Sequence, residues 1–510
     1  MWITPIFLNI LFLFPLVSGK CAWDTCPQWV NDPNTVNIHF VPHSHDDMGW
    51  LKTPDDYFTG INKNIQLPFA VYHIYTNVVT ELKMNPKRKF TVCEVGFLTM
   101  WIENADEGLF NDFIDLVNNG QIEFVCGGWV QPDEAASHYI DLVDMYTLGL
   151  RKLKNIIGEN CTKVRTGWQI DPFGHSREHS NILAMLGYES VYFAREHHKE
   201  HDLRKKNKNL EFHWYTSNEN PDRKLISGAF YGSLYGAPTL FRWDFTGDPS
   251  PPVIDNPNLE GYNVDYYISA LQFEINVRLA TQPHNHLLFL MGGDFQYNNA
   301  DMVFTNLDKL IKIANNITTR KIHAFYSTPS CYTEGVRESI LSWTNKTSDF
   351  FPYADKDHAY WTGYFTSKPA MKGLVRQSSN IVNSVRQLGV FSFNKQLDEY
   401  SVKELKLEKA LGLSQHHDGI TGTSKEFVTQ DYERKLLDGW NTAESAFNDY
   451  FSNLSQKFVH TSAKFPPQMF CRNLNESQCD FTKNNQDNFT VMVYNGYSQN
   501  VKQLVRIPLY

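Results

Sequence analysis

Five short motifs spread along this chain carry the carboxylate and imidazole side chains that metal-assisted hydrolysis uses. Metal ligands and paired carboxylates usually converge from distant parts of a chain, so the set is more informative than any one motif. The motifs are His43-Ser44-His45-Asp46-Asp47, Ile170-Asp171-Pro172-Phe173-Gly174-His175-Ser176, Ala194-Arg195-Glu196, Gly293-Asp294-Phe295 and Gln415-His416-His417-Asp418-Gly419.

The first motif has the spacing of half a zinc site. In extended backbone alternate residues share a face, so His43, His45 and Asp47 can point the same way. Zinc takes about four ligands, among them His nitrogen and Asp oxygen, and a catalytic site leaves room for substrate. A hydrogen-bonded structural role competes for each residue taken alone. For the pair His45 and Asp47, both interpretations stay open at this point.

Asp171 and Asp294 are the two carboxylates that we choose for cleavage of a glycosidic bond. In such hydrolysis one carboxyl group serves as acid and then base, and the other attacks the anomeric carbon when configuration is retained. Arg195 could clamp a carboxylate and hold it ionised. The competing roles are a helix cap for Asp171, a turn residue for Asp294 and a surface charge for Arg195.

Strand-like and helix-like runs alternate from residue 35 to about residue 329. This alternation predicts an α/β fold, with a mostly parallel sheet or an irregular barrel covered by helices. The predicted strands are 36–41, 90–97, 122–125, 167–170, 191–194, 287–291 and 322–326, and the predicted helices are 67–84, 109–117 and 142–157. Four motifs follow predicted strands directly, at the edge where α/β folds bind ligands.

The remainder of the chain changes character twice. Apolar residues at helical spacing over 374–388, 402–413 and 427–451 predict a three-helix bundle, with His416 and His417 between its second and third helices. Strands are then predicted at 489–494 and 501–507, and two strands alone bury too little, so we expect the start of a β domain. The predicted divisions are a signal peptide (1–19), an α/β catalytic domain (20–345), the three-helix bundle (346–456), and a linker with the first strands of an incomplete β domain (457–510).

Composition and the N-terminus indicate a glycoprotein of the secretory pathway. The 510 residues are 42% hydrophobic with a net charge of -9, which is ordinary for a globular protein and gives no basic footprint for nucleic acid. Residues 6–17 are apolar and residues 17–19 are small, as in a signal peptide. A signal anchor is the alternative, but the run is short for a bilayer span and contains Pro15.

Sequons and cysteines agree with an oxidising compartment. Six N-x-S/T sequons begin at Asn160, Asn316, Asn345, Asn453, Asn475 and Asn488. Some of the eight cysteines should pair there, and Cys471 and Cys479 are close enough to close a small loop. Because no C-x-x-C pair occurs, a thiolate zinc site is not expected.

Taken together, the motifs resemble those of the zinc-dependent retaining α-mannosidases. Residues 43–53 are similar to the opening motif of that family, residues 167–176 to its nucleophile motif and residues 415–423 to its third signature, while 293–297 and 360–365 also agree. The resemblance runs from about Cys26 to the end of the chain and favours the lysosomal kind. It implies an α/β domain, a three-helix bundle and β domains, in the order that the residues themselves predict.

The resemblance also assigns roles to the candidate residues. It implies a zinc ion held by His45, Asp47, Asp171 and His417. Asp171 would also be the nucleophile, and Asp294 the acid/base. The expected substrate contacts are Arg195 beside the nucleophile, Trp50 under the mannose ring, Asp418 on a sugar hydroxyl and His416 in the pocket wall, with Tyr235 a weaker match to a family tyrosine. Disulfides Cys26–Cys331 and Cys471–Cys479 are implied as well.

We therefore expect an exo-acting, Zn²⁺-dependent retaining α-mannosidase that acts on N-glycan-derived oligosaccharides and is lysosomal or secreted. Its partner would be a mannose-containing substrate, without nucleic acid or a stable membrane anchor, and a homodimer is compatible. Family enzymes continue through further β domains, so the alternative is a truncated, catalytically silent glycan-binding product. A metal-dependent deacetylase would rest on His45-Asp46-Asp47 alone, and the other motifs disfavour it.

Overall fold

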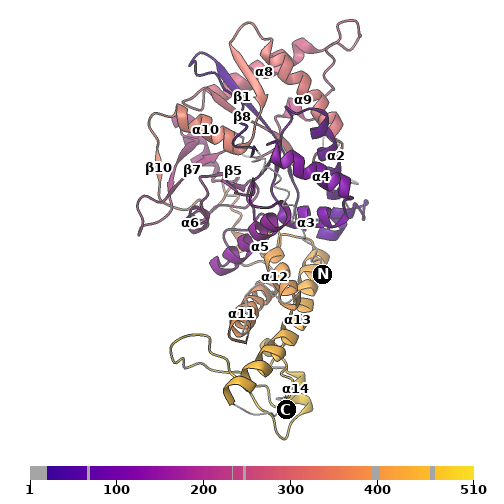
Figure 1. Ribbon diagram of the computed structural model, residues 1–510. Helices are drawn as coiled ribbons and strands as arrows, with labels where there is room; N and C mark the ends of the chain where they lie inside the picture. Colours follow the sequence, from indigo (N-terminus) through magenta and orange to yellow (C-terminus); the bar gives the residue numbers. More distant parts are fainter. Residues whose placement is uncertain (1–19, 66–68, 233, 245–248, 393–401, 460–465) are drawn as a thin grey trace, which may run out of the picture.

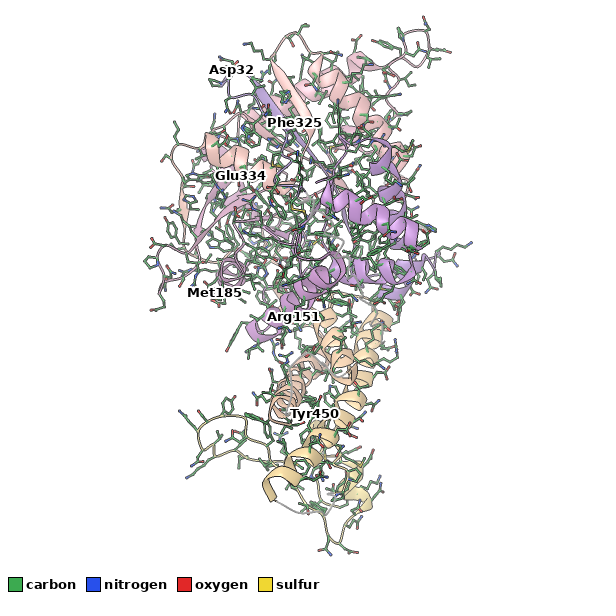
Figure 2. The ribbon with its side chains drawn as sticks, viewed as in Figure 1. Asp32, Arg151, Met185, Phe325, Glu334 and Tyr450 are labelled. Carbon is green, nitrogen blue, oxygen red and sulfur yellow. A yellow bond between two sulfur atoms is a disulfide. The ribbon has the colours of Figure 1, made fainter. Side chains whose placement is uncertain are left out.

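The computed structural model describes residues 20–65, 69–232, 234–244, 249–392, 402–459 and 466–510. The predicted signal peptide, residues 1–19, lies outside the described residues. Figure 1 shows an α/β body from which three helices extend on the side of α5 (Tyr139–Ile157): α11 (Pro369–Ser392), α12 (Val402–Ser414) and α13 (Glu426–Val459). Helix α12 packs against α5. Helix α13, which carries Tyr450, leads away from the body (Figure 2).

Two five-stranded sheets form the α/β body. The first has the order β3 (Ile122–Phe124), β2 (Phe90–Val92), β1 (Val36–His45), β8 (His286–Asp294), with β9 (Ile322–Tyr326) paired to the first half of β1, and all of these pairs are parallel. The second has the order β10 (Asn345–Lys346), β6 (Glu211–Tyr215), β7 (Lys224–Ala229), β5 (Ser190–Phe193), β4 (Thr166–Gln169). Only β6 and β7 are antiparallel among the described strands. The predicted α/β class with a mostly parallel sheet is confirmed, although the sheet is divided in two.

Helices cover both sheets, and the central strand is enclosed completely. All ten residues of β1 are buried, as expected for a parallel strand covered on both faces. The helices of the α/β body are α1 (Pro54–Thr59), α2 (Val71–Met84), α3 (Val95–Asn104), α4 (Glu107–Asn118), α5, α6 (Arg177–Met185), α7 (His198–Asn207), α8 (Val264–Leu279), α9 (Ala300–Asn315) and α10 (Pro329–Ser339). No described helix is both long and apolar enough to span a bilayer.

Three predicted strands differ from the structure. The strand predicted at 90–97 ends at Val92, and α3 begins at Val95, because a short apolar run fits a buried strand and a buried helix equally well. Residues 489–494 and 501–507, predicted as strands, form no strand and are largely exposed. A strand needs a neighbour for its backbone hydrogen bonds, and neither segment has one among the described residues.

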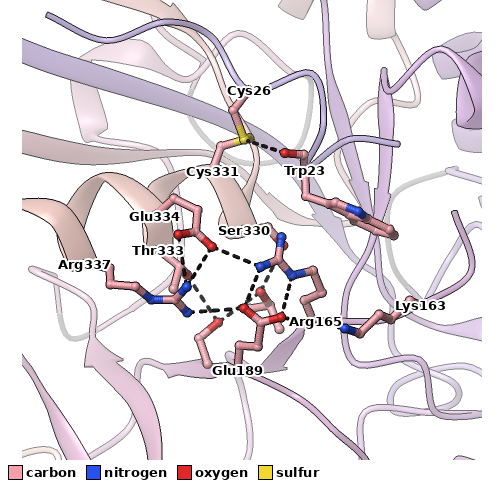
Figure 3. A network of polar contacts seen from close by, with 12 residues as sticks. Trp23, Cys26, Lys163, Arg165, Glu189, Ser330, Cys331, Thr333, Glu334 and Arg337 are labelled. Carbon is pink, nitrogen blue, oxygen red and sulfur yellow. Dashed lines mark hydrogen bonds and ion pairs between the residues drawn. A yellow bond between two sulfur atoms is a disulfide. The ribbon is translucent and has the colours of Figure 1, made fainter. Parts of the chain in front are cut away.

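Two disulfides and an ion network join distant segments, and a third disulfide closes a short loop. Cys26–Cys331 and Cys471–Cys479 form as the resemblance implies, and Cys21 pairs with Cys161. Beside the Cys26–Cys331 bond, Arg165 donates two hydrogen bonds to the Glu189 carboxylate, at 2.8 and 2.6 Å (Figure 3). Glu334 of α10 accepts a third hydrogen bond from Arg165 at 3.0 Å. The network therefore joins the starts of β4 and β5 to α10.

Candidate active site

The carboxyl ends of strands from both sheets bring the predicted site residues together. His45 ends β1 and Asp294 ends β8, and these two residues are directly paired across the parallel ladder. Asp171 lies two residues beyond the end of β4. His416 comes to the same region from the segment after α12, through a backbone bridge to Pro132. Segments far apart in the sequence thus converge on one buried site.

His45, Asp47, Asp171 and His417 form a compact buried cluster. His45 Nε2 lies 3.0 Å from Asp47 Oδ1 and 3.5 Å from Asp171 Oδ2, and His417 Nε2 lies 3.2 Å from each of these oxygens. His45 Nε2 and Asp47 Oδ1 are buried without a hydrogen bond of normal geometry. Imidazole and carboxylate ligands are those that zinc accepts, so the four residues fit a metal ion.

A second ligand set overlaps the first. Asp47, His416, His417 and Asp418 also bring potential ligand atoms within 4.8 Å of one another. Its contacts are longer: His416 Nε2 lies 3.4 Å from Asp47 Oδ1 and 3.7 Å from Asp418 Oδ2. His417 Nδ1 is bonded to the carbonyl oxygen of Gln131 at 2.9 Å, which leaves Nε2 alone for a metal. His417 belongs to both sets, and its Nε2 can bind only one ion, so the two sets cannot both hold a metal ion.

The charges of the cluster explain why two histidines can stay protonated when no ion is bound. Burial lowers the pKa of His417, but hydrogen bonds with Asp171 and Asp47 outweigh it and raise the pKa to about 10. Burial likewise opposes the charge on His45, and Asp47 with Asp171 raises its pKa well above the usual value. Protons on the imidazoles then supply positive charge that a bound cation would otherwise bring.

Arg195 holds Asp171 in the ionised form. Its Nε donates to Asp171 Oδ1 at 2.7 Å, and Nη2 donates to the same oxygen. The guanidinium lies over the rings of Trp361, Tyr353 and Phe173, 5.0, 5.8 and 5.7 Å from their centroids. Burial raises the pKa of Asp171, but the Arg195 charge and the two imidazoles outweigh it and hold the pKa well below the usual value.

Asp294 is shifted in the opposite direction. Burial raises its pKa, and the negative charges of Asp47 and Asp171 add to this. The hydroxyl of Tyr235 donates a hydrogen bond to Asp294 Oδ1 at 2.7 Å and favours the ionised form. Two carboxyl groups with pKa values driven apart are the arrangement that divides acid and nucleophile roles. A cavity of 720 Å³, lined by Arg195, Tyr235 and Asp294 among others, opens beside Asp294.

The remaining predicted residues border the cluster more loosely. Asp418 Oδ1 accepts a hydrogen bond from the Thr423 hydroxyl at 2.5 Å, and burial with the Asp47 charge raises the Asp418 pKa to about 7. His416 is fully buried, and burial lowers its pKa to about 4. Trp50 is half-buried in the loop after β1.

Sequence reasoning underrated or missed several neighbours of the site. His43 bonds through Nε2 to the carbonyl oxygen of Tyr235, which is the hydrogen-bonded structural role considered for a histidine near a strand end. The loosely matched Tyr235 contacts the proposed acid Asp294 through its hydroxyl group. Gln131 was missed, because no spacing rule marks a glutamine whose contacts run to the backbone of a distant segment. Glu134 was missed as well; it accepts hydrogen bonds from His175 Nδ1 at 2.8 Å and from the Ser176 N–H at 2.7 Å.

Two carboxyl groups with opposed pKa shifts are the arrangement that glycoside hydrolases use, and the carboxyl ends of parallel strands are where α/β folds bind ligands. Comparison with known families agrees. Residues 35–356 match the glycosyl hydrolases family 38 N-terminal domain, and residues 359–454 match the alpha mannosidase middle domain. The chain belongs to glycosyl hydrolase family 38, which confirms the resemblance found in its motifs.

Curated relatives agree with this family, and a solved structure shares the fold. Lysosomal alpha-mannosidases of Mus musculus and Homo sapiens are each 36% identical, over 99% of this chain and 49% of their own length. An alpha-mannosidase of Arabidopsis thaliana is 36% identical over 97% of this chain and 48% of its own length. The chain thus spans about half the length of these relatives. An alpha-mannosidase structure from Enterococcus faecalis V583 shares the fold, with a TM-score of 0.63 at 15% identity over 83% of this chain and 43% of that chain.

Proposed function

We propose that this chain carries the catalytic site of a zinc-dependent, exo-acting, retaining α-mannosidase that removes terminal α-mannose from N-glycan-derived oligosaccharides. One observation carries the proposal: Asp171 is held ionised by Arg195, while Asp294 beside it is biased toward its protonated form. Asp171 belongs to a buried cluster fit for a metal ion, and Asp294 is paired across the sheet with His45 of that cluster. The mannose specificity rests on the curated relatives, which are alpha-mannosidases.

His45, Asp47, Asp171 and His417 would hold the zinc ion, whose Lewis acidity would orient and polarise the hydroxyl groups of the mannose ring. Asp171 would attack the anomeric carbon and form a covalent glycosyl ester. Asp294 would give its proton to the departing glycosidic oxygen. In the second step Asp294 would take a proton from water as the water oxygen replaces Asp171 at the anomeric carbon, which restores the starting configuration.

Neighbouring residues would orient these steps. Arg195 keeps Asp171 ionised and fixes the direction of one carboxylate oxygen. Trp50 would lie under the mannose ring, Asp418 would accept from a sugar hydroxyl, and His416 would form part of the pocket wall. The three disulfides agree with a protein of the secretory pathway, and a lysosomal or secreted location follows the curated relatives.

The test is Asp171→Asn in purified residues 20–510, assayed on an aryl α-mannoside. Loss of all turnover is expected, because an amide cannot form the glycosyl ester. Turnover equal to that of the unsubstituted chain would refute the assignment. Mannose binding without zinc-dependent hydrolysis by the unsubstituted chain would favour the silent glycan-binding alternative, which is of interest because the chain spans about half of its relatives.

A further inference from the structure

We propose that Gln131 is a positioning residue that holds two of the zinc ligands, Asp171 and His417, in their binding orientations. The proposal deepens the proposed function, because it rests on the same metal site. Gln131 lies in the loop after β3 and is fully buried. It contacts both ligands, although 246 residues separate these two along the chain.

The side chain of Gln131 fixes the backbone of Asp171. Its Oε1 accepts the N–H of Asp171 at 3.0 Å. The amide can face only one way, since the Asp171 N–H needs an acceptor and only the oxygen of the Gln131 amide accepts. Its Nε2 is then directed to Cys93 Sγ at 3.7 Å. Asp171 follows the end of β4 in a segment without regular secondary structure, so this bond replaces a ladder bond that the strand no longer provides.

The backbone of Gln131 fixes the imidazole of His417. Its carbonyl oxygen accepts from His417 Nδ1 at 2.9 Å and from the His417 backbone N–H at 3.3 Å. An imidazole that donates through Nδ1 presents the lone pair of Nε2 to a metal ion. That Nε2 faces Asp47 and Asp171, each at 3.2 Å. One residue therefore sets the ring orientation of one ligand and the backbone position of another.

The loop that carries Gln131 is itself anchored on both sides. Pro132 is bridged to His416, and the Asp133 N–H donates to the Gln415 carbonyl oxygen at 2.9 Å. On the other side, Gln169 Nε2 of β4 donates to the Pro132 carbonyl oxygen at 2.9 Å. The loop thus connects the α/β body to the segment after α12. Asp171 lies in the α/β body and His417 in that segment, so the loop joins the two parts that carry the proposed ligands.

The experiment compares the zinc affinity of Gln131→Leu, Gln131→Asn and Gln131→Glu with that of the unsubstituted chain, by competition with a chromophoric chelator. Leucine removes the acceptor and asparagine withdraws it by one methylene, so both should weaken zinc binding, roughly 10- to 100-fold. Glutamate keeps an acceptor oxygen at the same reach and adds a negative charge, so its zinc affinity should not fall below that of the unsubstituted chain. If Gln131→Leu does not fold, Gln131→Asn provides the test of the lost acceptor.

Gln121→Leu is the matched control. Gln121 is buried too, and its Nε2 donates to the carbonyl oxygens of Leu82, Asn85 and Arg88, away from the cluster. This variant should lower the melting temperature and leave the zinc affinity unchanged. If Gln131→Leu or Gln131→Asn binds zinc as tightly as the unsubstituted chain, the positioning of Asp171 by the Gln131 side chain is overturned, while the metal assignment stands. Equal losses in all three Gln131 variants would also overturn that positioning, and absence of zinc binding by the unsubstituted chain would overturn the metal assignment and this inference together.

Discussion

Tyr235 and Asp294 are joined by a 2.7 Å hydrogen bond, in which the phenol donates to the carboxyl group that borders the cavity. A donor at this position favours the ionised form of Asp294 and works against burial and the charges of Asp47 and Asp171, which favour the protonated form. Tyr235 therefore limits how far the pKa of the proposed acid rises.

Removing this hydroxyl should shift the alkaline limb of the pH profile. In Tyr235→Phe the pKa of Asp294 rises further, so the acid keeps its proton to higher pH and the alkaline limb of kcat/KM moves upward. A hydrogen bond to a charged group contributes about 1.5–3 kcal/mol, which corresponds to a shift of roughly one to two pH units. The measurement is the pH dependence of kcat/KM on an aryl α-mannoside.

Tyr297→Phe provides the control for that shift. Tyr297 is buried near the same strand, but its hydroxyl donates to the backbone carbonyl oxygen of Met291 at 2.6 Å, not to a carboxylate. The alkaline limb of kcat/KM in Tyr297→Phe should match that of the unsubstituted chain. A limb that stays in place or moves to lower pH in Tyr235→Phe would contradict the role of Tyr235.

The two overlapping ligand sets can be separated by single substitutions. His45 belongs only to the set with Asp171, and His416 belongs only to the set with Asp418. Residues that only orient metal ligands contribute roughly 10- to 100-fold to metal affinity. We expect His45→Ala, which removes a ligand itself, to lose at least as much zinc affinity, and His416→Ala to keep the affinity of the unsubstituted chain. Zinc content after dialysis and a competition titration measure both. The reverse ranking would place the ion in the second set.

Much of the site was predictable because it follows strand ends. His45, Asp171 and Asp294 lie at or just beyond the carboxyl ends of parallel strands, a location that hydrophobic patterns reveal without knowledge of the sheet order. The pairing of His45 with Asp294, by contrast, depends on which strands are neighbours, and no local pattern encodes that.

The parts that sequence reasoning missed depend on contacts with the backbone or on absent partners. Gln131 acts through an amide oxygen and its own carbonyl group, and buried glutamines elsewhere in the chain look the same in sequence. The predicted strand at 90–97 changes to a helix at Val95 because tertiary packing decides short apolar runs. Residues 489–494 have strand-like composition but no neighbouring strand in the described chain.

Arg195 should set the acid limb of the same pH profile. In Arg195→Met the guanidinium bonds to Asp171 disappear, so the pKa of Asp171 rises and a smaller fraction is ionised at acid pH. A cation beside a carboxylate lowers its pKa by about one to three units, so the acid limb should move up by a comparable amount. Arg165→Met, which removes a guanidinium outside the site, should leave the limb unchanged. An unmoved limb in Arg195→Met would show that other groups keep Asp171 ionised.

The Arg165 network predicts a pH-dependent contribution to stability. Hydrogen bonds from Arg165 lower the pKa of Glu189 below its usual value of 4.5. A carboxylate whose folded pKa is lowered stabilises the protein above the unfolded pKa and loses this contribution as the pH falls through the folded value. Glu189→Gln should therefore lower the free energy of unfolding by about 1 kcal/mol near neutral pH, since the pair is partly exposed, and the difference should shrink below about pH 4.5.

Denaturant unfolding at several pH values measures this free-energy difference. Glu103→Gln is the control, because its exposed carboxylate lies 3.5 Å from Lys152 in a comparable surface pair. A difference that persists unchanged at low pH would mean that Glu189 contributes by packing and not by its charge.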